Sequence, residues 1–243
     1  MIQHKAKIHL ERGVGALEMA LMLPLLLILL LSFLQIGLII QASFIVNHSA
    51  MAAIRSAIVT IPATVSSARS RLSEERNEIR LNDTQSPKLL EIQRAAAFVL
   101  ISISPRTSPG GGSGAVLDGA SLSSLGRVLQ GFAALSGNPN LSGEMIERAG
   151  YAYHPRNTRI EIIPASEKQR QGRFLDHDDV TVKVIYRYRL VVPGAARLFG
   201  QRDPDGGYYV EIKSQYTLPI EGEPLITPTD RQRSLGTAII VPD

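Results

Sequence analysis

An unbroken apolar run near the N-terminus constrains this 243-residue chain more than any other feature. Between Met19 and Ile40, 18 of the 22 residues are Ala, Leu, Ile, Met or Phe, and none carries a charge. A helix of this length spans about 33 Å at about 1.5 Å per residue, whereas the hydrocarbon core of a bilayer is about 30 Å thick. The run therefore predicts one membrane-spanning helix and excludes a purely cytosolic enzyme.

The charges on either side of the run predict its orientation. Residues 1–13 contain Lys5, Lys7 and Arg12 against the single acid Glu11, whereas residues 41–54 contain neither Lys nor Arg. Basic residues collect on the cytoplasmic side of a span. We therefore expect a single-pass protein of the inner (cytoplasmic) membrane, with a cytoplasmic N-terminus and a periplasmic or otherwise extracytoplasmic body.

Three interpretations of this N-terminal segment remain open. A cleaved signal peptide would use the A-x-A match at residues 50–52, but its apolar core should be only about 7–15 residues long. An uncut signal anchor fits both the length and the charges. The third interpretation depends on Glu18, the fifth residue after Gly13 and the one immediately before the dense apolar run.

The third interpretation is supported by a sequence pattern. Residues 12–24 read R-G-x-x-A-x-E-x-A-x-x-x-P, with Gly13, Glu18 and Pro24 at its fixed positions. This pattern resembles the signature of TadE-like proteins, which are pseudopilins of the tight-adherence (Flp) pilus system. The resemblance covers residues 12–55, less than a quarter of the chain.

The resemblance implies roles for Gly13, Val14 and Glu18, and helix geometry implies one for Pro24. A prepilin peptidase would cut on the cytoplasmic side between Gly13 and Val14. Glu18 would set the register of assembly by meeting the free amine of a neighbouring subunit, because a buried carboxylate becomes tolerable once it is paired. Pro24 should kink the helix, with either a packing role or a role in extraction and assembly.

The first part of the exported body is predicted to be mostly helical. Residues 63–81 are rich in Arg and Glu and suggest a solvated helix with i,i+4 charge pairs. Ser86-Pro87 predicts a helix start, and Pro105 predicts the end of that helix. The Gly/Pro-rich residues 105–114 predict a linker, and two short helices are expected over 121–135 and 143–150.

The second part of the body is predicted to be β-rich. Residues 159–163, 180–192 and 208–218 alternate apolar and polar side chains, as strands with one buried face do. Within the connection between the last two strands, residues 194–199 predict a helical turn or a hydrophobic flap. A possible edge strand at residues 239–241 ends a loosely ordered tail.

These elements predict an α+β, pilin-like fold in which a long N-terminal transmembrane helix and a helical segment precede a small antiparallel sheet. The expected divisions are a leader over 1–13, the transmembrane helix over 14–61, a mostly helical region over 62–153 and a β-rich region over 154–243.

Candidate chemistry in the body is sparse. The chain has no Cys, which excludes disulfides, thiolate catalysis and Cys-based zinc sites. The acidic stretches 176–179 and 203–207 are predicted to be turns, because neither has the ligand spacing of a metal site. The net charge of +4 is dispersed and aromatics make up only 5% of the residues, which argues against nucleic-acid binding.

The sequence therefore predicts a structural pseudopilin or assembly component of a tight-adherence pilus or secretion system, not an enzyme, with neither cofactor nor metal. The resemblance implies, as partners, copies of the chain, related pseudopilins, a prepilin peptidase and the inner-membrane pilus platform. The alternative is a signal-anchored envelope protein, outside any pilus, whose exported domain binds a ligand or partner.

Overall fold

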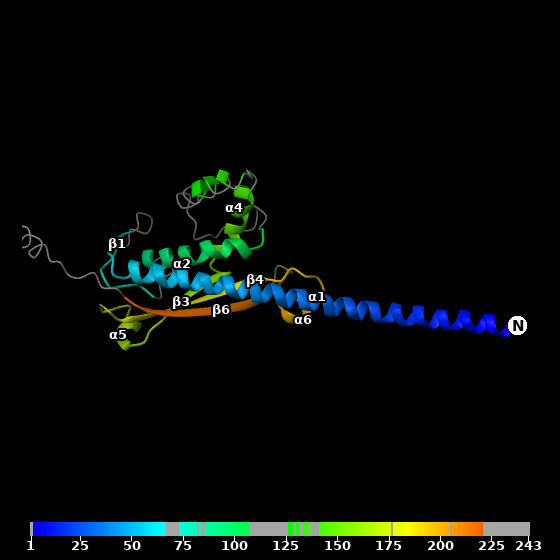
Figure 1. The fold of residues 1–243 in the computed structure, drawn as a ribbon. Helices are drawn as coiled ribbons and strands as arrows, with labels where there is room; N and C mark the ends of the chain where they lie inside the picture. The colour runs from blue at the N-terminus through cyan, green and yellow to red at the C-terminus, as the bar shows by residue number, and fades with distance from the viewer. Residues whose placement is uncertain are drawn as a thin grey trace, which may run out of the picture.

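One long helix runs through the fold. The computed structural model describes residues 2–66, 73–81, 83, 86–106, 126–128, 130–131, 134–135, 137, 141–175, 177–204 and 206–220. Helix α1, Ile2–Thr60, runs without interruption through Pro24. Its first half projects away from the rest of the molecule and its second half lies inside the body (Figure 1). The helix ends two residues before Pro62, where the sequence predicts its end.

The second helix begins where the sequence predicts. Helix α2, Pro87–Leu100, has Ser86 as its N-cap, and the Ser86 hydroxyl accepts a hydrogen bond from Leu89 N–H at 3.2 Å. A 3-10 turn, η1 (Ile101–Ile103), continues it before Pro105. Helix α4, Leu141–Ala152, packs against α2 and η1 and confirms the helix expected over 143–150.

Four antiparallel strands form the sheet, in the order β3-β4-β6-β5. Strand β3 covers Thr158–Ile163, β4 covers Asp179–Arg189, β6 covers Tyr208–Pro219, and the short edge strand β5 covers Gln201–Arg202. Two short helices, α5 (Glu167–Arg170) and α6 (Ala195–Phe199), lie in the connections between strands. The three strands predicted from alternation are confirmed, except that β4 ends at Arg189, three residues before the predicted end at 192. Helix α6 confirms the expected helical turn.

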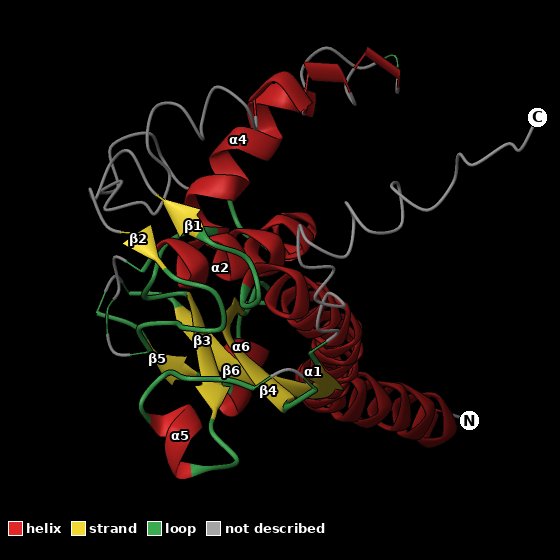
Figure 2. Ribbon diagram, turned by 90° about the vertical axis from the view of Figure 1, so that its left-hand side faces the viewer, coloured by secondary structure: helices red, strands yellow, loops and turns green. Residues whose placement is uncertain are grey.

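The helices cover one face of the sheet. Helix α1 contacts β4 and β6, and α2 contacts β3, so the helical pair and the sheet form two layers (Figure 2). Side chains alternate strictly along β4, and those that face the helices are buried. The largest of them, Tyr186, is fully buried. This α+β arrangement is the predicted fold class.

A line of small residues lets α1 and α2 approach closely. The buried side of α1 recurs every three or four residues, which is the helical period. Ser49 lies in this seam and donates a hydrogen bond from its hydroxyl to the Ala96 carbonyl oxygen of α2 at 2.9 Å. The other buried α1 residues in the body are Ala42, Val46, Ala50, Ala53, Ile54 and Ala57.

The charged helix expected over residues 63–81 is wrong for the residues that the structure describes there. Strands β1 (Val65–Ser66) and β2 (Ser73–Glu74) pair antiparallel, and the chain then turns through Asn77, whose φ is 58°. Ile79 is buried, and its N–H donates to the Gly172 carbonyl oxygen at 2.8 Å. Tertiary contacts therefore outweigh the i,i+4 charge pairing, which contributes only about 0.2–0.5 kcal/mol per pair.

The remaining sequence expectations fall partly outside the described residues. The described positions between 126 and 135 are helical, whereas most of the expected linker at 105–114 and the tail containing residues 239–241 lie outside. Both acidic stretches contain turns. Asp178 accepts a hydrogen bond from Leu175 N–H at 2.9 Å, and Asp203 accepts one from Gly206 N–H at 2.9 Å.

A buried lysine joins the end of α1 to the following turn. The Lys88 ammonium group donates hydrogen bonds to the carbonyl oxygens of Ile61 at 2.8 Å, Glu75 at 2.6 Å and Glu78 at 2.8 Å. Ile61 follows directly after α1, so this cation lies at the negative end of the α1 dipole. Three carbonyl groups and one charge thus satisfy each other inside the core.

Replacing this lysine should destabilise the fold. Lys88→Met keeps the length of the side chain but removes the charged donor that three carbonyl oxygens share, although two of them, those of Ile61 and Glu75, also accept from backbone N–H groups. We expect this loss to lower the free energy of unfolding by about 3 kcal/mol. Urea unfolding of the full chain in detergent, followed by near-ultraviolet circular dichroism of the tyrosines, measures the change. The matched control is Lys168→Met, at an exposed position on α5, which should change the value by less than about 0.5 kcal/mol.

Buried tyrosines connect α4 and η1 to the sheet. Tyr151 and Tyr186 pack edge to face, with ring centroids 6.3 Å apart. The Tyr151 hydroxyl donates to the Arg187 carbonyl oxygen at 2.9 Å, and the Tyr186 hydroxyl lies 2.9 Å from the Ser104 hydroxyl. Burial raises the pKa of Tyr151 to about 12 and that of Tyr153 to about 12, and it also raises the pKa of Tyr186.

These raised pKa values predict a loss of stability at alkaline pH. The unfolded chain releases tyrosine protons near pH 10, whereas Tyr151 and Tyr153 hold theirs to about pH 12. Their contribution is complete below pH 10 and is lost as the pH rises from 10 through 12. Tyr151→Phe should cost about 1 kcal/mol at neutral pH, because it loses the bond to Arg187, and should make the alkaline decline shallower. Unfolding curves at stepped pH test both effects; an equally steep decline in the variant would contradict the assignment.

Candidate functional site

The projecting half of α1 presents a continuous apolar surface. All side chains from Glu18 to Leu30 are exposed, although eleven of these thirteen residues are Ala, Leu, Ile or Met. Within the part of the chain that the structure describes, the helical segment Glu18–Thr60 is long and apolar enough to cross a membrane. Because large apolar side chains rarely stay in water over such an area, this surface indicates a non-aqueous environment.

The projecting half of α1 contains three features that interrupt its apolar character: Ser32, Pro24 and Glu18. Ser32 donates its hydroxyl hydrogen to the Ile28 carbonyl oxygen at 2.8 Å, which removes the need for water. Pro24 lies inside the helix and has no N–H, so the Ala20 carbonyl oxygen lacks its usual helical donor. Glu18 is exposed and stands at the N-terminal end of the apolar surface.

The structure places the four sequence-predicted site residues on one helix and separates all of them from the body. Gly13 and Val14 lie within the helical span of α1, upstream of the apolar surface. Glu18 and Pro24 lie about 9 Å apart along the axis at a rise of about 1.5 Å per residue. Whatever acts on these residues must therefore approach from outside the body.

Gln35 marks the point where α1 meets the body, and the sequence did not predict this role. Its side chain is fully buried, and its Oε1 accepts a hydrogen bond from Val192 N–H at 3.0 Å. A single polar residue late in an apolar run was the available signal, but its partner lies 157 residues away.

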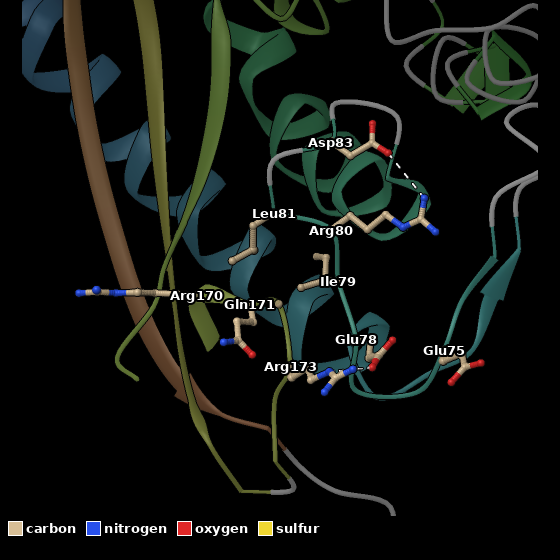
Figure 3. Close-up of a pocket in the computed structure, with 10 residues that line it drawn as sticks. Glu75, Glu78, Ile79, Arg80, Leu81, Asp83, Arg170, Gln171 and Arg173 are labelled. Carbon is tan, nitrogen blue, oxygen red and sulfur yellow. Dashed lines mark hydrogen bonds and ion pairs between the residues drawn. The ribbon is translucent and has the colours of Figure 1, made fainter. Parts of the chain in front are cut away.

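A second candidate site lies at the opposite end of the body. A cavity of about 660 Å³ opens between the 75–83 segment and residues 170–173 after α5 (Figure 3). Its charges are mixed: Arg173 Nε lies 3.2 Å from a Glu78 carboxylate oxygen, and Arg80 lies 4.0 Å from Asp83. The site offers polar recognition of a partner or ligand, since both signs of charge line one opening.

The backbone around this cavity is fixed by close contacts. Gly172 has a φ of 81°, and a Cβ atom at this position would collide with the Ile79 carbonyl oxygen. The N–H of Phe174 donates to the Asn77 carbonyl oxygen at 2.9 Å, so both walls are held together. Among the residues described, no three His, Cys, Asp or Glu side chains lie close enough to hold a metal ion.

The arrangement of α1 and the body is consistent with a membrane-anchored protein that has one apolar N-terminal helix and an α+β body. Residues 13–55 match the model of the family described as TadE-like protein. This match confirms the family resemblance of the N-terminal segment and associates it with a component of the tight-adherence (Tad) pilus. Searches of curated proteins and of solved structures found no match to the chain.

Proposed function

We propose that this protein is a structural pseudopilin, or assembly component, of a tight-adherence (Flp-type) pilus or related secretion system. One observation carries the proposal: the family match at 13–55 coincides with a helix that is exposed and apolar in its first half and forms the spine of the body in its second. Such a helix can hold the protein in the inner membrane and later pack against other copies. The proposed role is structural, without catalysis or cofactor.

The proposed partners act on the projecting half of α1. A prepilin peptidase cuts between Gly13 and Val14 on the cytoplasmic side, and the new amine at Val14 becomes available for pairing. Glu18 meets the corresponding amine of a neighbouring subunit, which neutralises a carboxylate that is costly within a membrane. Related pseudopilins and the inner-membrane platform complete the set of partners.

A second candidate function is favoured by the distal cavity. A signal-anchored envelope protein would use the mixed charges around Glu78 and Arg173 to bind a ligand or another envelope protein. Its α1 would stay uncut and would only anchor the body. The two functions differ in the N-terminus that the mature protein carries.

Mass spectrometry of the protein isolated from membranes distinguishes these functions. A mature N-terminus at Val14 is expected for the pseudopilin, Met1 for the plain anchor and Ala53 for an ordinary signal peptide. Gly13→Ala should block the cut, because a side chain at this position obstructs access to the scissile bond. Continued cutting before Val14 in this variant would count against the proposal.

Neutralising Glu18 should separate cutting from assembly. Glu18→Gln keeps the size of the side chain and leaves Gly13 and Val14 in place, so we expect the cut to continue. Self-association, measured by co-purification of two differently tagged copies, should fall at least about ten-fold, because the amine at Val14 loses its counter-charge. Gln41→Ala, at an exposed polar position further along α1, is the matched control and should associate normally. Unchanged association in the Glu18 variant would contradict the pairing.

A further inference from the structure

The loop between β4 and β6 carries an exposed apolar patch beside α1. Residues 190–202, which we term the 190–202 loop, include α6, and α6 contacts α1. Ala195 and Ala196 face the body and are buried, whereas the side chains of Val191 and Leu198 are 70% and 65% exposed. Phe199 is 39% exposed. The loop thus buries Leu190 and Val192 with these alanines and exposes its three other large apolar side chains.

Backbone contacts hold this loop in one shape. Gly194 turns the chain at a φ of 82°, and the N–H groups of Ala196 and Gly200 donate to carbonyl oxygens at 3.1 Å and 3.0 Å. A Cβ atom on Gly200 would lie 2.9 Å from the Ala196 carbonyl oxygen, which is closer than packing allows. These contacts fix the backbone of the loop, so the exposed apolar side chains keep their positions at its surface.

The hydrogen bond between Gln35 and Val192 sets the level of the loop along α1. Figure 1 shows α6 at the end of the body from which the free half of α1 projects. A transmembrane helix needs about 20 residues, so a span that begins at Met19 extends to about Leu38. Gln35 lies three residues before that point, and the loop bonded to it lies at the same depth. This geometry places the loop at the boundary between lipid headgroups and acyl chains.

The charge of the loop fits that boundary. Residues 190–202 contain Arg197 and Arg202 and neither Asp nor Glu. Both arginines are exposed. Cationic side chains next to exposed leucine and phenylalanine are the combination that binds an anionic lipid surface. On α1, Phe33 and Ile36, the residues that flank this level of the helix, are also exposed.

We propose that the 190–202 loop is a second membrane contact, which inserts Leu198 and Phe199 into the outer leaflet while Arg197 and Arg202 bind anionic headgroups. The body then contacts the bilayer surface directly, in addition to its attachment through α1. Because α1 and the loop are joined through Gln35, their depths are coupled. The inference rests on the proposed membrane insertion of α1 and adds a lipid-binding surface on the exported domain.

Fluorescence quenching in vesicles tests the proposal, and the Cys-free chain allows single labels. The full chain carries Leu198→Cys, Leu26→Cys or Lys168→Cys, each labelled with an environment-sensitive fluorophore. Each variant is reconstituted into vesicles of phosphatidylethanolamine and phosphatidylglycerol with brominated acyl chains. Leu26 reports the span, and Lys168 on α5, at the far end of the body (Figure 1), is the matched exposed control.

We expect brominated lipid to quench the labels at 26 and 198 about two-fold, and to leave the label at 168 unchanged. Quenching at 26 without quenching at 198 overturns the loop contact while the span stands. A label at 198 that is shielded from both brominated lipid and aqueous iodide indicates a protein partner and also overturns it. If neither 26 nor 198 is quenched, the membrane insertion of α1 fails, and both proposals fall with it.

Discussion

The fold depends on one uninterrupted helix that serves two environments. From Glu18 to Leu30, α1 exposes every side chain, and most of these are large and apolar. After Gln35, the buried side of α1 is built mainly from Ala and Ser. The first half requires contact with lipid or with other helices. The second half requires α2 and the sheet, because small side chains bury enough area only when partners approach closely. The body is accordingly organised around the latter half of α1.

Two polar contacts define the ends of that shared segment. Gln35 bonds Val192 where α1 enters the body, and the Lys88 ammonium bonds the Ile61 carbonyl oxygen where it leaves. Both side chains are fully buried, so neither can exchange its protein partner for water unless the core opens. A change in the tilt or depth of α1 must therefore move the 190–202 loop and the turn at residues 75–78 with it.

Sequence predicted the elements whose signals are local. Alternation along β4 and the Ser86-Pro87 helix start were sufficient because a strand face and an N-cap are each defined within a few residues. The charged stretch 63–81 was predicted to be helical. This prediction was wrong because backbone groups of the stretch form hydrogen bonds with residues that lie further along the sequence. Carbonyl groups of Glu75 and Glu78 accept from Lys88, and Ile79 bonds Gly172. The role of Gln35 was missed for the same reason, since its hydrogen-bond partner Val192 lies in the connection between β4 and β6.

The identity of the candidate-site residues could be predicted from the sequence, but their surroundings could not. The glycine, glutamate and proline at 13, 18 and 24 are recognisable from spacing alone, and the family match covers them. Yet Glu18 and Pro24 are both exposed, on the half of α1 that projects from the described part of the body. An enzyme gathers its catalytic residues from several elements into one enclosed site. Residues placed on a projecting helix can act only with a partner that the helix is inserted into or packed beside, which is the arrangement that the proposed assembly role requires.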